Sequence, residues 1–342
     1  MSRTTKHRIA ILASAIALPI TTTAHHAFTG VFDMQNITEL NGELTELLWR
    51  NPHVRFSIRT AKGEIWEIET NSVSILRRMD ISPDIMSVGD NITVAGFPAR
   101  NGNREMWINN VLLADGREVV TRPGVEPYFS DGTLGTSDVW LAEGTEASES
   151  NAQDLGIFRV WSTHFTGPSR SLFVDDMPLT ASAAAARAGF DPVTDDPIGD
   201  CTPKGMPWIM AQPYPVEFVD EGEVILFRIE EYDAVRRIHM NPDAGSVPTP
   251  SKLGYSQGRW VEEELHVETS AVNWPYFNSS GIPQSSEIEL FERFYLNADG
   301  SELHYELTAT DPATFTEPVT LDKAWMWRPG EVVRPYECTP SE

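Results

Sequence analysis

The feature of this sequence that most restricts its fold is a two-residue alternation of apolar and polar side chains in its second half. At residues 302–310, Leu303, Tyr305, Leu307 and Ala309 fall on one face of an extended segment, and the polar residues between them fall on the other. One buried face and one wet face are what an antiparallel sheet requires. No helical crossover of the kind that builds a parallel sheet interrupts the pattern.

Comparable segments recur along residues 151–342, separated by turn signals such as Asp220-Glu221-Gly222. A series of about eight strands favours an up-and-down barrel of lipocalin type or a curved open sheet. A short alanine-rich helix is predicted at residues 180–188. The predicted strands are residues 158–165, 216–219, 223–232, 235–240, 258–261, 264–270, 288–296, 302–310 and 321–328.

A smaller barrel is predicted at residues 25–120. Its strands are residues 42–49, 53–59, 63–70, 91–97 and 106–113. A short helix capped by Ser72 stands between the third and fourth strands, and Asn101-Gly102 is a typical hairpin turn. This order is that of an oligonucleotide/oligosaccharide-binding (OB) barrel. The predicted fold is therefore all-β: an OB-like five-stranded barrel, an acidic linker at residues 121–150, and a larger antiparallel β-meander.

The first 24 residues have the layout of a secretory signal peptide. Three basic residues precede an apolar run at residues 9–18, and Ala24 closes a small-residue cleavage site. The run is too short to span a bilayer, and no later segment approaches the roughly twenty apolar residues that a membrane helix needs. We therefore expect a periplasmic or secreted protein without membrane insertion.

The net charge limits the expected partners, and the two cysteines predict a covalent link. The net charge of −24 repels nucleic acid and anionic lipid, so neither is an expected partner. Cys201 and Cys338 form an even pair, which in an oxidising compartment predicts a disulfide. This bond would tie the start of the second domain to its last strand. A metal site made by the two cysteines is the alternative.

A histidine group is the predicted metal site. Cleavage after Ala24 would leave His25 at the N-terminus, followed by His26. The amine and ring nitrogen of a terminal histidine can bind one metal ion together. A second ring, from His26 or His53, would complete a T-shaped nitrogen site that suits copper. The alternative is that the first two histidines have no metal role and that His53 only caps a strand.

Arg236, Trp260 and Arg293 are the predicted ligand-binding residues of the larger barrel. A barrel mouth is a common ligand pocket, and arginine–carboxylate pairs there could orient a polar or anionic ligand. The alternative is structural, with ion pairs that fix strand register and Trp260 filling the core.

His304, Glu292 and Asp311 are the predicted catalytic residues. A histidine paired with a carboxylate, such as His304 with Glu292, can act as a general base. Here too the alternative is that these side chains only pair strands with one another.

Several distinctive motifs run along the chain. They include His25-His26-Ala27-Phe28, Trp49-Arg50-Asn51-Pro52-His53, Arg236-Arg237-Ile238, Glu292-Arg293-Phe294 and the segment 253–260. In these motifs the chain resembles an uncharacterised family of exported bacterial proteins, whose HHxF and WxNPH domain is followed by a β-rich companion domain. The resemblance implies no established activity. Where relatives carry His-Ser-Glu, this chain has Ser285-Ser286-Glu287, which argues against a catalytic histidine there.

The sequence favours an exported ligand-binding protein without established catalysis, whose ligand is a small molecule or a saccharide. Three alternatives stay open. They are a copper-dependent oxidoreductase that uses the histidine chelate, a metal-free hydrolase or isomerase in the C-terminal barrel, and an envelope factor that binds another protein. The sequence holds no nucleophile elbow, zinc-binding helix, P-loop or dinucleotide fingerprint.

Overall fold

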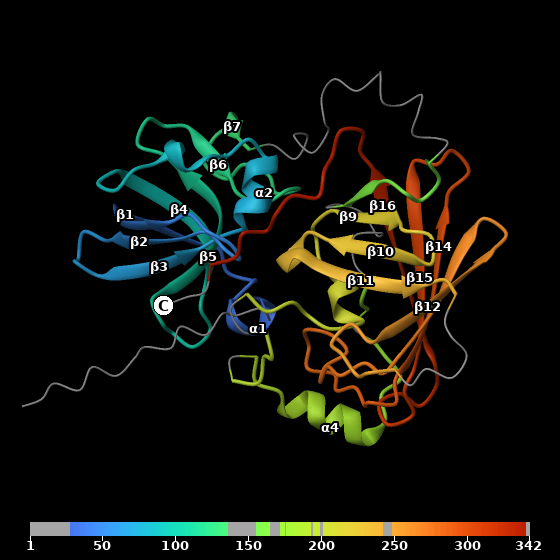
Figure 1. Ribbon diagram of the computed structural model, residues 1–342. Coiled ribbons are helices and arrows are strands. Elements are labelled where there is room, and N and C mark those ends of the chain that lie inside the picture. Colours follow the sequence, from blue (N-terminus) through green and yellow to red (C-terminus); the bar gives the residue numbers. More distant parts are fainter. Residues whose placement is uncertain are drawn as a thin grey trace, which may run out of the picture.

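The computed structural model describes residues 28–135, 155–164, 172–174, 176–192, 194–198, 201–241 and 248–339. In these residues the chain forms two β-barrels that lie side by side (Figure 1). The predicted all-β class, with a five-stranded barrel followed by a larger one, is confirmed. No helix among the described residues is both long and apolar enough to span a bilayer.

Five strands and their helix form the first barrel, in the order β3-β2-β1-β4-β5, and a parallel pairing of β3 with β5 closes it. Two short strands, β6 (Glu118–Val120) and β7 (Thr133–Leu134), extend the sheet into the segment predicted as a linker. The other elements are α1 (Phe28–Val31), β1 (Thr38–Leu48), β2 (Arg55–Arg59), β3 (Ile65–Glu69), α2 (Val73–Arg78), the 3-10 turn η1 (Pro83–Ile85), β4 (Asn91–Pro98) and β5 (Glu105–Leu112).

Local sequence explains two features of this barrel. Helix α2 begins where the hydroxyl of Ser72 accepts a hydrogen bond from the backbone N–H of Ile75, so the predicted cap is confirmed. Strands β4 and β5 approach closely at Gly96, where a β-carbon would lie 2.1 Å from the carbonyl oxygen of Trp107. Only glycine allows that approach.

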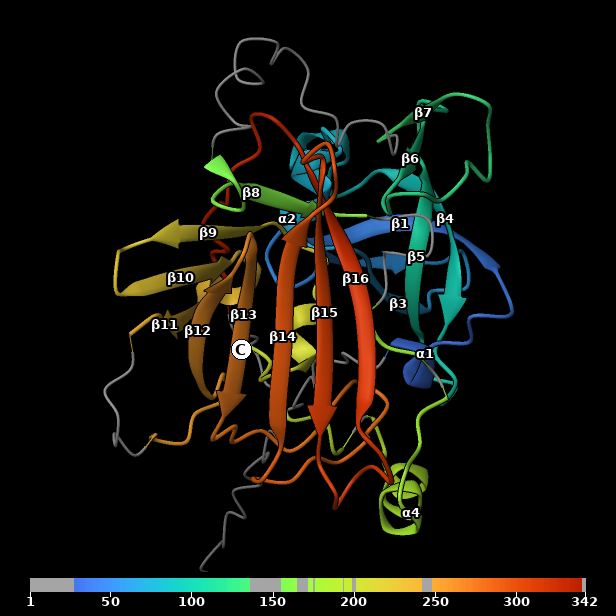
Figure 2. The ribbon, with the colours of Figure 1, turned by 90° about the vertical axis from the view of Figure 1, so that its right-hand side faces the viewer.

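Nine strands form the second barrel, in the closed order β10-β11-β12-β13-β14-β15-β16-β8-β9. Figure 2 shows the long strands β14, β15 and β16 side by side. The pairs are antiparallel except β11 with β12, which pair in parallel. The strands are β8 (Val160–Thr163), β9 (Val216–Asp220), β10 (Val224–Ile229), β11 (Ala234–His239), β12 (Tyr255–Val261), β13 (Glu264–Ser270), β14 (Glu289–Leu296), β15 (Glu302–Thr310) and β16 (Val319–Trp327).

Large side chains fill the interior of this barrel. The inward residues of β15 are those that the alternation predicts, with Leu303, Leu307 and Ala309 fully buried. Aromatic rings pack against one another inside the barrel, and the centroids of Phe218 and Phe227, on the neighbouring strands β9 and β10, are 4.5 Å apart. Outside the strands lie α4 (Ala181–Gly189) and the 3-10 turns η5 (Trp208–Ala211) and η6 (Glu231–Asp233).

After β16 the chain returns to the first barrel, as the red segment of Figure 1 shows. We call residues 328–339 the strap. Tyr336 of the strap is buried in the core of the first barrel, where its ring meets that of Tyr214. The strap therefore adds a late segment of the chain to the core of an early domain.

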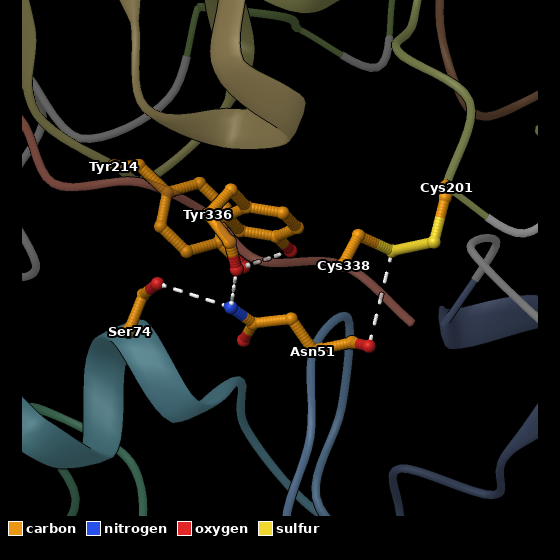
Figure 3. The surroundings of a disulfide bond; sticks show 6 residues. All are labelled: Asn51, Ser74, Cys201, Tyr214, Tyr336 and Cys338. Atoms are coloured by element: carbon orange, nitrogen blue, oxygen red, sulfur yellow. Dashed lines mark hydrogen bonds between the residues drawn. A yellow bond between two sulfur atoms is a disulfide. The ribbon is translucent and has the colours of Figure 1, made fainter. Parts of the chain in front are cut away.

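The disulfide between Cys201 and Cys338 is confirmed. Its predicted position is corrected in one respect, because Cys338 lies in the strap, beyond β16. The strap bridges to Asn51, whose side-chain amide donates to the carbonyl of Tyr336 (Figure 3). The bond thus holds the strap against the first barrel.

A buried ion pair also joins the barrels. The guanidinium of Arg78, on α2, donates to both carboxylate oxygens of Glu230 at 2.6 Å and contacts Glu331 of the strap. A bidentate pair of this kind fixes orientation as well as distance.

Candidate functional site

An open groove of about 1150 Å³ lies at the end of the second barrel that is uppermost in Figure 2. Its walls come from three segments, which are the β12–β13 hairpin, the β14–β15 turn, and residues 155–159 before β8. Their side chains include Leu155, Phe158, Arg159, Trp260, Glu262, Glu263, Glu264, Tyr295, Leu296 and Asp299. Barrel mouths are common ligand sites.

Trp260 forms the aromatic wall of this groove. Along β12, Ser256 and Gly258 point into the barrel and are buried, so Trp260 has the same direction but reaches the open mouth. Its side chain is 43% exposed, and its ring meets that of Phe158 with centroids 6.0 Å apart. The predicted ligand-binding residue thus lies in a groove, and the alternative in which it fills the core does not hold.

Arg159 lies at the floor of the groove. Its guanidinium lies between the rings of Trp161 and Trp327, 4.6 and 4.8 Å from their centroids. It donates to the carbonyls of Gly156 and Gly300, so two of the groove segments are joined through it. It forms no ion pair with any described residue, and burial lowers its pKa.

Carboxylates line the rim. Hydrogen bonds from His266 and from Arg293 lower the pKa of Glu264, and hydrogen bonds from Ser301 lower the pKa of Asp299. Glu262 and Glu263 form the turn of the β12–β13 hairpin beside them. The groove therefore offers hydrogen-bond acceptors next to an exposed aromatic face.

The three predicted ligand-binding residues are not brought together. Arg236 is buried inside the barrel, Trp260 lies at its mouth, and Arg293 lies on its outer face. There the guanidinium of Arg293 donates to Glu264 and Glu306 at 3.0 Å. Adjacent residues of a strand point to opposite faces, which separates Arg293 from the interior.

The predicted His304–Glu292 pair is wrong in its geometry. Glu292 faces the interior opposite Leu307, whereas His304 faces outward and stacks on Tyr295 with centroids 5.3 Å apart. Asp311 is buried elsewhere and accepts hydrogen bonds from the backbone and hydroxyl of Ser285. The structure therefore gives these three residues no shared catalytic site.

Glu292 belongs to a buried network instead. It accepts hydrogen bonds from the guanidinium of Arg236, the hydroxyl of Tyr305 at 2.8 Å and the hydroxyl of Thr269 at 3.1 Å. Arg236 also donates to the hydroxyl of Ser256. Both charges are satisfied, so the network fixes the register of five strands, as the structural alternative expects.

His53 is the one member of the predicted metal site that the structure describes; His25 and His26 lie outside the described residues. Its Nδ1 contacts a carboxylate oxygen of Glu69, and its ring meets the edge of Trp107. The described residues contain no group of three or more histidines, cysteines or acids that could hold a metal ion. A carboxylate on Nδ1 is the outer contact that orients metal-binding histidines.

Sequence reasoning missed Lys323. Its amine is enclosed in the second barrel, where it donates to the carbonyl of Met210 at 3.2 Å and lies 4.5 Å from the ring centroid of Trp325. Burial lowers the pKa of Lys323 to about 7. The alternation could have revealed it, because Leu321, Lys323 and Trp325 share one face.

Comparison with known proteins adds one finding. A family of unknown function, DUF6152, matches residues 13–107, which include β1 to β4 and the start of β5. The match covers most of the first barrel and none of the second, and it brings no activity. None of the curated proteins matches the chain.

Proposed function

We propose that this is an exported ligand-binding protein and that the groove at the mouth of the larger barrel holds its ligand. Trp260 is the observation that carries the proposal. This large aromatic side chain is 43% exposed, so a ligand that covers it removes apolar surface from water and thereby stabilises the complex. The groove around it, about 1150 Å³, is large enough for a ligand of several rings.

The lining favours a saccharide. The C–H face of a sugar ring can stack on Trp260 beside Phe158, while the carboxylates of Glu262, Glu263 and Asp299 accept hydrogen bonds from its hydroxyls. An anionic ligand would meet repulsion from the same carboxylates. A neutral saccharide therefore fits this lining better than an acidic one.

Export is part of the proposal. The signal-peptide layout of residues 1–24 and the Cys201–Cys338 disulfide both support it, since structural disulfides persist in oxidising compartments. Fractionation of the source cells, followed by N-terminal sequencing, tests it. A protein found only in the cytoplasm with an intact leader contradicts export.

Binding is tested with a panel of neutral oligosaccharides and the disulfide-bonded protein in isothermal titration calorimetry. Trp260→Ala should weaken binding at least tenfold, because it removes the stacking face. Tyr128→Ala is the matched control, since Tyr128 is 44% exposed on the first barrel. Equal affinities for the two variants, or no binding to any saccharide, contradict the proposed site.

The orientation of His53 favours a second candidate, a copper-dependent oxidoreductase. The contact between its Nδ1 and Glu69 is the kind that directs the other ring nitrogen of a metal-binding histidine. Copper bound by His25, His26 and His53 would supply redox chemistry. His53→Ala should then lose copper measured by mass spectrometry, and an exported protein that does not begin at His25 contradicts the chelate.

A further inference from the structure

A second groove, of about 450 Å³, lies where the two barrels meet. One wall is the β1–β2 connection with Trp49, Arg50 and Asn51, a second is the end of α2 with Arg77, and the third is the strap. This junction is distinct from the mouth of the larger barrel. None of its lining residues belongs to the proposed saccharide site.

Its charge differs from that of the whole chain. The net charge of the protein is −24, yet the charged side chains that line this groove are Arg50, Arg77 and Glu337. Arg77 is exposed and forms no ion pair with any described residue, whereas the neighbouring Arg78 is buried and paired with Glu230 and Glu331. Arg77 thus carries a charge that no described carboxylate neutralises.

Asn51 holds the walls of this groove together. Asn51 lines the groove and is 4% exposed. Its Nδ2 donates to the carbonyl of Tyr336 and to the hydroxyl of Ser74, which fixes the orientation of the amide (Figure 3). These two bonds tie the β1–β2 connection to α2 and to the strap, so one side chain joins the three walls of the groove.

The strap makes this groove a structured site. The backbone N–H of Thr339 donates to the carbonyl of Asn51, and the Cys201–Cys338 bond fixes the residue before it. Pro335, Tyr336 and Glu337 then form a wall opposite α2. Because that wall belongs to the strap, the site is complete only when the two barrels and the disulfide are assembled.

We propose that this junction binds a small anion, a carboxylate or a phosphate. Arg77 and Arg50 hold the negative group through charge-assisted hydrogen bonds. The ring of Trp49 covers one side of the ligand. This groove would therefore prefer an anion, whereas the groove at the barrel mouth would prefer a neutral ligand.

Calorimetric titration of the disulfide-bonded, full-length protein tests the proposal, with citrate as the carboxylate probe and inorganic phosphate as the phosphate probe. We expect one equivalent of at least one of them to bind. Arg77→Ala should weaken that binding at least tenfold. Arg104→Ala, which removes an exposed arginine paired with Glu64 outside the groove, should leave it unchanged.

Two further variants separate the possible explanations. Trp260→Ala should bind the anion as the wild type does, which distinguishes this site from the barrel mouth. The double variant Cys201→Ser/Cys338→Ser, checked for folding by circular dichroism, should bind at least tenfold more weakly because the strap wall is released. The proposal is overturned if neither anion binds, if Arg77→Ala and Arg104→Ala bind alike, or if the folded double variant keeps full affinity.

Discussion

The buried amine of Lys323 makes the stability of this protein depend on pH near neutrality. The side chain is 2% exposed, and its amine has one hydrogen bond, to Met210, and one aromatic neighbour, Trp325. Among the described residues no carboxylate forms an ion pair with it, and burial is the cause of its pKa shift. Burial therefore lowers the pKa of Lys323 from 10.5 to about 7, because the charged form loses its hydration.

The sign follows from proton binding. Between pH 7 and 10.5 the unfolded chain holds the proton of Lys323 and the folded chain does not, so the free energy of unfolding rises with pH across this window. One pKa unit corresponds to about 1.4 kcal/mol. The amine therefore costs the fold about 4 kcal/mol at pH 7, and this cost disappears towards pH 10.5.

Lys323→Met removes this cost while keeping similar volume. We expect the variant to be more stable than the wild type near pH 6, with an advantage that shrinks by about 2.5 kcal/mol between pH 6 and pH 9. Urea unfolding at several pH values measures it, and Lys62→Met, an exposed surface change, is the control. The substitution also removes the hydrogen bond to Met210 and the contact with Trp325. Their loss changes the free energy of unfolding by an amount that does not vary with pH. An advantage that stays constant from pH 6 to 9 would refute the reasoning.

Three other predictions concern the stability of the two barrels. Glu292→Gln leaves the charge of Arg236 buried without its partner and should lower the free energy of unfolding by about 3–5 kcal/mol in urea titrations; a loss below about 1 kcal/mol contradicts the network. Gly96→Ala should lower it by at least about 1–3 kcal/mol, because its β-carbon would collide with the carbonyl of the next strand; an unchanged melting temperature contradicts the close approach. The Cys201→Ser/Cys338→Ser variant opens a loop of 137 residues and should lose about 4–5 kcal/mol, measured against the oxidised protein; equal stability means that the strap is held without the bond.

Alternation within single strands predicted much of the fold, because it depends only on neighbours in the chain. It assigned Leu303, Tyr305 and Leu307 to the interior and His304 to the other face, as the structure has them. Register between strands depends on tertiary contacts that one strand does not encode. For that reason the pairing of His304 with Glu292 failed, since the interior carboxylate lies opposite Leu307.

The position of the strap could not be predicted for a similar reason. Residues 328–339 show no alternation, and they are held by contacts to Asn51, Tyr214 and Cys201 from distant parts of the sequence. The cysteine pair predicted the bond but not which barrel its second half contacts. The groove at the junction, which needs the strap as a wall, was therefore beyond sequence reasoning.

The most direct test of the ligand site is an NMR titration of the indole N–H signals of the ten tryptophans. The signal of Trp260 is assigned by its loss in Trp260→Ala, and a neutral oligosaccharide that binds in calorimetry is then added. We predict that the Trp260 signal moves most and that the signal of Trp107, which is buried in the first barrel, stays in place. A bound saccharide that leaves the Trp260 signal unmoved would contradict the account, because its ligand would then lie elsewhere.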